Sequence, residues 1–202
     1  MNGVNRRLLL SALVLAPSGC GSLLPTGGSP PKLYTLTPAT DVAAGPAIRS
    51  QLLVDVPVSA AALDTERIAL SRSANTIDYY AEAAWTDWAP LMIQSLLVQS
   101  FENSGRITAI GRESLALRAN YVLRPELRHF EAEYHDAPAP NAHVAVGVKL
   151  VKMPDRAIVA QRNFEASAPA AANQMTAIVE SFDKALHEVM RQIVDWTLAT
   201  VR

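Results

Sequence analysis

The side chains in this chain that could bind a metal ion are few, and their spacing matches no zinc-binding motif. No histidine has a second ligand at the spacing of a zinc site, and neither His-Glu-x-x-His nor a pair of cysteines occurs. We therefore expect no metal site, and we interpret each histidine as a surface residue or a structural residue with satisfied hydrogen bonds. The four histidines are His129, His135, His143 and His187.

A pair of glutamates is the closest approach to an acid/base site. Glu131 and Glu133 share one parity on a predicted strand, so their side chains could lie about 7 Å apart on one face. Acid/base catalysis also needs a pocket and two separated pKa values, so a solvated strand face is the simpler interpretation. Gly-x-Ser-x-Gly, a P-loop and a dinucleotide fingerprint are missing as well. The sequence thus predicts a protein that is not an enzyme and uses no cofactor.

The single cysteine, Cys20, predicts a covalent lipid anchor. Arg6 and Arg7 precede an apolar run, residues 8–16, and small residues lead directly into Cys20, which is the layout of a secretory signal peptide. The run would reach only about half way across a bilayer core of roughly 30 Å, so it is not a transmembrane span. Cleavage before a cysteine resembles a bacterial lipoprotein signal, although Pro17 stands where such signals usually carry Leu. The alternative is an ordinary secreted protein with a free cysteine near its cleavage site.

These features divide the chain into three predicted parts. Residues 1–19 form a signal peptide, residues 20–32 a lipidated flexible tether, and residues 33–202 a single domain. Acyl chains on the thiol would hold the chain at a membrane, since each buried CH₂ contributes about 0.8 kcal/mol. Gly21 follows the cysteine where an Asp would resemble an inner-membrane retention signal. We therefore expect the periplasmic face of the outer membrane.

Charge and cysteine content exclude several classes of protein. The formal net charge is -1, and removing residues 1–19 takes away two arginines and no acid, which brings the predicted mature chain to -3. A nucleic-acid partner would call for a basic excess or a basic stripe, so none is expected. With its one cysteine bound to lipid, the domain would have no disulfide and would depend on its core.

Hydrophobic periodicity predicts an α+β domain. Apolar residues alternate along segments such as 121–134, 144–150 and 158–168, and they recur every three or four residues at 90–101 and about 173–200. We expect a two-layer fold with a mixed, mostly antiparallel sheet of about seven strands and two main helices on one face.

The longest predicted strand contains a fault in its alternation. Tyr121, Leu123 and Leu127 share one parity, whereas Phe130 and Tyr134 share the other. We predict a β-bulge between Leu127 and Phe130, because one extra residue would bring both sets to the same face.

A series of short motifs, in order along nearly the whole predicted mature chain, resembles the ABC-type transport auxiliary lipoproteins of the PqiC type. Each motif is weakly specific alone, and their order and spacing together carry the resemblance. The motifs are Cys20, Tyr34-Thr35-Leu36, Val54-Asp55-Val56-Pro57, Leu63-Asp64-Thr65-Glu66-Arg67-Ile68, Tyr79-Tyr80, and a helix entry at Trp85 and Trp88-Ala89-Pro90-Leu91.

The resemblance implies a lipid-anchored protein in the periplasm that works with an inner-membrane ABC transporter and its mammalian-cell-entry (MCE) domain protein. Such systems move phospholipid or other hydrophobic molecules between membranes, and the auxiliary protein would dock the assembly at the outer membrane. Related assemblies are symmetric rings, so the resemblance also implies a homo-oligomer. The family has no catalytic residues to carry over. Tyr34, Leu36 and Trp85 match its motifs, and they either contact a partner or pack in the core.

Another class of protein fits the same sequence features. A periplasmic lipoprotein that binds a soluble ligand or the cell wall would also be anchored, compact, nearly neutral and without an active site. A pocket lined by apolar side chains would favour this alternative.

Overall fold

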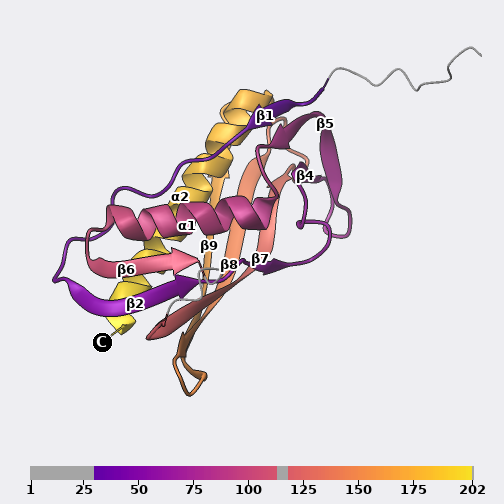
Figure 1. The fold of residues 1–202 in the computed structure, drawn as a ribbon. Helices are drawn as coiled ribbons and strands as arrows, with labels where there is room; N and C mark the ends of the chain where they lie inside the picture. The colour runs from indigo at the N-terminus through magenta and orange to yellow at the C-terminus, as the bar shows by residue number, and fades with distance from the viewer. Residues whose placement is uncertain (1–29, 113–117, 202) are drawn as a thin grey trace, which may run out of the picture.

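Three long antiparallel strands form the centre of the domain. The structure is a computed structural model that describes residues 30–112 and 118–201. Strand β7 (Tyr121–Glu133) pairs with β8 (Asn141–Lys152), which pairs with β9 (Ala157–Pro169) (Figure 1). The register of β7 against β8 shifts between Leu127 and His129, so the predicted β-bulge is confirmed.

The second edge of β7 is divided among shorter parallel strands. Its first residues pair with β2 (Ile48–Val54), which continues to β6 (Ile107–Arg112), and its middle pairs with β3 (Val58–Ser59). Its last residues pair with β4 (Arg67–Ser71). From there the sheet continues through β5 (Asp78–Trp85) to β1 (Lys32–Tyr34).

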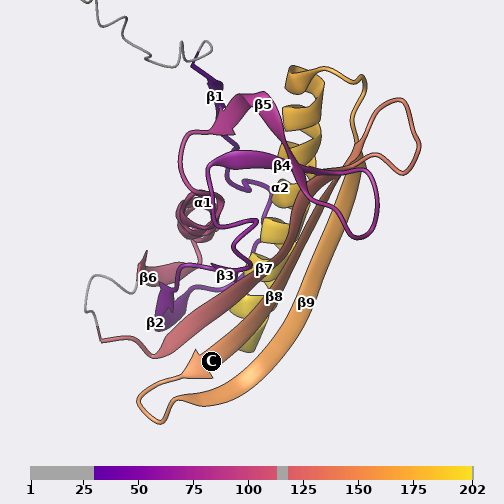
Figure 2. The same cartoon turned by 90° about the vertical axis from the view of Figure 1, so that its right-hand side faces the viewer.

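Two helices cover one side of the sheet. Helix α1 (Ala89–Asn103) has Pro90 in its first turn, where the missing N–H costs no hydrogen bond, and it is followed by Gly105 with a φ of 61°. Helix α2 (Met175–Thr200) packs along β8 and β9 and also contacts α1. Figure 2 shows both helices on the same side of the curved β7–β9 sheet. None of the described helices is long and apolar enough to cross a bilayer.

The core lies between α2 and the inward face of the sheet. Trp85 of β5, Phe130 of β7 and Phe182 of α2 form an aromatic cluster, with ring centroids 5.1–5.4 Å apart. Val146 of β8 points to the same side and is buried. Because these side chains come from distant segments, the cluster joins both halves of the divided sheet to the long helix.

The α+β class and the two helices are confirmed, and the strand count differs slightly. The described residues form a nine-stranded sheet, against about seven predicted strands. β3 is only two residues long and carries no periodic pattern from which it could be predicted. The predicted signal peptide, most of the tether and Cys20 lie outside the described residues.

Candidate functional site

The helices leave one face of the β7–β9 sheet uncovered, and we call this the outer face. Near the start of β7 it is hollowed by a trough of about 700 Å³. Basic residues that line the trough include Arg124, Arg128, Lys149 and Arg156. The exposed side chain of Ile158 adds an apolar part. The trough therefore combines positive charge with apolar surface.

Two of the trough's positive charges are already paired. Nε of Arg124 lies 3.0 Å from a carboxylate oxygen of Asp55, and an Arg128 nitrogen lies 2.9 Å from Oε2 of Glu126. Both pairs are partly exposed, and exposed pairs contribute at most about 1 kcal/mol. They hold the two guanidinium groups along the strand.

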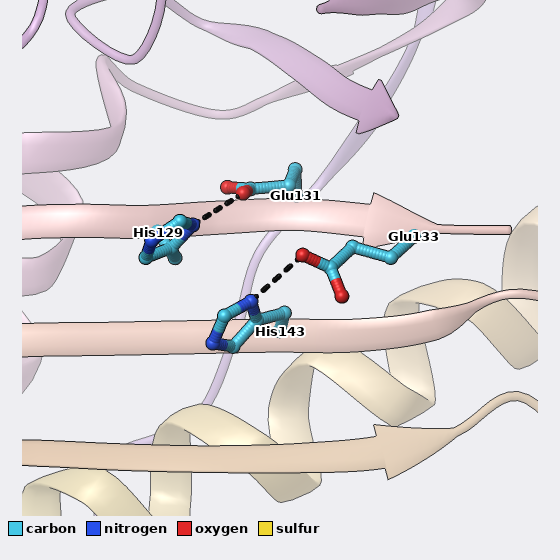
Figure 3. Close-up of side chains that lie close together, drawn as sticks. All are labelled: His129, Glu131, Glu133 and His143. Atoms are coloured by element: carbon cyan, nitrogen blue, oxygen red, sulfur yellow. Dashed lines mark hydrogen bonds and ion pairs between the residues drawn. The ribbon is translucent and has the colours of Figure 1, made fainter. Parts of the chain in front are cut away.

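At the other end of the outer face, two histidines and two glutamates come together (Figure 3). His129, Glu131 and Glu133 alternate along β7 after the bulge, and Glu131 pairs in register with His143 of β8. Nδ1 of His129 lies 2.6 Å from Oε1 of Glu131, and Nδ1 of His143 lies 2.8 Å from Oε1 of Glu133. We call these four residues the His/Glu cluster.

Further hydrogen bonds surround the His/Glu cluster. Nε2 of His143 donates to Glu165 of β9 at 2.8 Å, and Nε2 of His135 donates to the second oxygen of Glu133 at 2.7 Å. The backbone N–H of Phe130 donates to the second oxygen of Glu131 at 2.5 Å. The cluster is therefore held in place by three neighbouring groups.

Hydrogen bonds in the cluster favour the charged forms of Glu133 and His143. Burial acts to raise the pKa of Glu133, but hydrogen bonds from His143 and His135 outweigh it and lower that pKa below its usual value. Burial acts to lower the pKa of His143, yet its bonds to Glu133 and Glu165 outweigh it and raise that pKa. The carboxylate and the imidazolium thus stabilise each other.

The structure places two of the three predicted partner-binding residues in the core. Leu36 is 3% exposed and Trp85 is 1% exposed, so both pack inside this domain. Tyr34 is half-buried and packs against the core, with the ammonium of Lys32 5.1 Å from its ring centroid. A role of these residues in partner binding stays a prediction. The predicted lipidation site, Cys20, lies outside the described residues.

The His/Glu cluster is what inspection of the sequence missed. Glu131 was expected on a solvated face, but it is only 5% exposed, so that interpretation is wrong for this residue. The histidines are satisfied by hydrogen bonds, as expected, and His187 is likewise bonded to Asp41. The alternation of His129, Glu131 and Glu133 places three polar side chains on one face, but it does not show that His143 lies beside them.

Comparisons with known proteins assign the domain to a family. The family model described as "ABC-type transport auxiliary lipoprotein component" matches residues 34–194. The crystal structure of protein XCC0632 from Xanthomonas campestris has 31% sequence identity and a TM-score of 0.75, covering 84% of this chain and 95% of that chain.

Two more distant similarities extend the comparison. The uncharacterized protein bll6063 of Bradyrhizobium diazoefficiens is 27% identical over 180 residues, or 87% of this chain and 47% of that protein, so this chain spans about half its length. A solved structure of an uncharacterized protein shares the fold, with a TM-score of 0.67 at 11% identity, over 83% of this chain and 99% of that one. The family match covers both halves of the divided sheet and most of α2, and the chain belongs to the ABC-type transport auxiliary lipoprotein family.

Proposed function

We propose that this protein is anchored to the outer membrane through lipid on Cys20 and docks the periplasmic end of an MCE-type lipid transport system. In this proposal it is a non-catalytic auxiliary component, and its partners are an MCE-domain protein and the subunits of an ABC transporter. It acts either alone or as a homo-oligomeric ring. The transporter would supply the energy, and this chain would supply the attachment.

The match to the family model over residues 34–194 carries the proposal. It reaches from the end of β1 into α2, so it covers nearly the whole folded domain and not a local motif. The sequence before this domain has the layout of a lipoprotein signal ending at Cys20. A membrane anchor, a short tether and a domain of this family are what a docking component needs.

In-cell crosslinking tests the proposal. The tagged full chain is expressed from its own locus, crosslinked in living cells and purified, and the captured proteins are identified by mass spectrometry. We expect an MCE-domain protein together with ABC subunits. A matched Cys20→Ser chain, which lacks the acceptor thiol, should capture less of the same partners because it is no longer held at the membrane.

Other outcomes of this experiment would reject the proposal. Recovery of neither an MCE-domain protein nor an ABC subunit would exclude the docking role. Fractionation of the same cells tests the location, since the wild-type chain should co-sediment with outer-membrane markers. Co-sedimentation with inner-membrane markers would refute the proposed outer-membrane location.

A ligand- or cell-wall-binding lipoprotein is the second candidate, and the trough favours it. Its volume of about 700 Å³ lies within the usual range of ligand sites, roughly 300–1,000 Å³. Its basic lining would suit an anionic ligand. In this case the purification should recover peptidoglycan or a small ligand without transporter subunits. Lys149→Glu in the trough should reduce the recovery, and Lys184→Glu on α2 should not.

A further inference from the structure

We propose that the His/Glu cluster is a binding site for one divalent transition-metal ion of the Zn²⁺ type. The site consists of Nδ1 of His129 and His143 and one carboxylate oxygen each from Glu131 and Glu133. It lies on the outer face between β7 and β8, and its function is independent of the proposed docking role.

The spacing of the four ligand atoms is close to that of a tetrahedral site. All of them lie within 4.8 Å of one another. An ion bound at about 2.0–2.2 Å from each ligand needs ligands roughly 3.3–3.6 Å apart. The two His–Glu contacts, at 2.6 and 2.8 Å, would open by less than about 1 Å, and the longest separation would close by up to about 1.5 Å. The rings of His129 and His143 are stacked, with centroids 4.4 Å apart and planes 15° apart. The exposed His129 ring must therefore turn before both Nδ1 lone pairs can point at one ion, because a histidine binds a metal in the plane of its ring. The ion would replace the proton that each histidine now shares with its glutamate.

Outer hydrogen bonds already hold three of the four ligands in the arrangement seen around bound metals. Histidine ligands of metals generally donate their second ring N–H to a carboxylate or carbonyl group. His143 does so to Glu165, while its Nδ1 faces the cluster. The second oxygens of Glu133 and Glu131 are held by His135 and by the backbone N–H of Phe130. This set of supporting bonds is independent of the spacing and indicates the same site.

Charge and ligand type select the class of ion. Two carboxylates and two neutral imidazoles carry a charge of about -2, which a divalent cation neutralises. Glu131 is buried, and a buried carboxylate needs a counter-charge. Imidazole ligands suit Zn²⁺ and its neighbours, whereas Mg²⁺ and Ca²⁺ prefer six or more oxygens. We therefore expect Zn²⁺ to bind and Mg²⁺ not to compete.

A hollow of about 420 Å³ gives the ion a path to the cluster. His129, Glu131 and Glu133 line it together with Arg72. The Arg72 guanidinium stacks 4.6 Å from the ring centroid of Tyr134. With four protein ligands no coordination position stays open, so the ion would join β7 to β8 and stabilise the hairpin.

Metal titration of the purified full chain tests the site. The chain carries no polyhistidine tag, and a chelator removes any bound metal beforehand. Zn²⁺ binding is then measured by calorimetry, and thermal unfolding is measured with and without Zn²⁺. We expect one Zn²⁺ per chain and a higher melting temperature in its presence. His143→Gln should weaken binding at least tenfold and remove the thermal gain, because it removes one ligand.

Two further variants separate metal binding from effects on folding. Glu165→Gln changes an exposed group outside the ligand set and should weaken Zn²⁺ binding about tenfold. His187→Gln removes a histidine of α2 that is paired with the carboxylate of Asp41, and it should leave Zn²⁺ binding unchanged. Cys20 is common to all these chains and cannot cause a difference between them. Absence of Zn²⁺ binding by the wild-type chain, or equal affinity in His143→Gln, overturns the proposal.

Discussion

Replacing Phe182 with alanine tests whether the aromatic cluster joins α2 to the divided sheet. Phe182 is fully buried and packs edge-on against Trp85 and Phe130, with centroids 5.3 and 5.1 Å away. Truncating a buried phenylalanine costs about 3–5 kcal/mol. Typical domains have only about 5–15 kcal/mol of unfolding free energy. We expect Phe182→Ala to stay folded but to lose a large part of its stability.

Unfolding of the full chain by urea and by heat is monitored by circular dichroism. For a domain of this size each kcal/mol lowers the melting temperature by about 2–4 °C, so the expected loss is roughly 6–20 °C. Phe182→Leu keeps most of the apolar volume and should lose about 1–2 kcal/mol. Leu91→Ala on the exposed side of α1 should change the unfolding free energy by less than about 0.5 kcal/mol. If Phe182→Ala cost less than about 1 kcal/mol, the cluster would not be what holds the helix to the sheet.

Three further outcomes follow from the sequence and the structure. Cys20→Ser should move the protein from the membrane fraction to the soluble periplasm, and continued retention on fractionation would show that another segment anchors it. Val146→Asp buries an unpaired charge, which costs several kcal/mol, so this variant should fail to fold. Lys149→Asp, at an exposed position of the same strand, should give the circular dichroism spectrum of the folded wild type. The hydrogen bond from His187 lowers the pKa of Asp41 in the folded protein. The bond therefore stabilises the fold at pH values above 3.8, the carboxyl pKa in the unfolded chain. This stabilisation is lost as the pH falls through the lower pKa of Asp41 in the folded protein. In urea unfolding, Asp41→Asn should therefore be less stable than wild type by up to about 1 kcal/mol at about pH 6. The difference should be smaller at about pH 3. An equal difference at both pH values would show that the Asp41 carboxylate does not stabilise the fold through His187.

Local periodicity predicted much of the fold, because each prediction depended on neighbouring residues alone. The β7–β8–β9 strands, both helices and the bulge all follow from apolar spacing within one segment. The division of the far edge of β7 among β2, β3 and β4 depends on parallel pairings between distant segments, which leave no local pattern. The buried positions of Leu36 and Trp85 likewise depend on what the rest of the chain places around them.

The His/Glu cluster could not be found by motif spacing, because its ligands are brought together by strand register. His143 follows Glu133 by ten residues, which matches no metal motif, yet the hairpin places it opposite Glu131. Predicting the site would have required the register of the hairpin as well as the alternation along each strand. Once the register is known, the diagonal positions on β7 put His129 and Glu133 within reach of the same point.

The bulge in β7 explains why one face of a hairpin carries two different surfaces. Before it, Arg124 and Glu126 point outward while Leu127 points into the core. The extra residue, Arg128, reverses the parity, so that Phe130 can enter the core and His129 turns outward. If Arg128 were paired as an ordinary strand residue, with no bulge, the residues after Leu127 would exchange faces. Both glutamates of the cluster would then enter an apolar core, at a cost of several kcal/mol each. One irregular position thus keeps the core continuous, and it also marks the boundary between the basic trough and the His/Glu cluster.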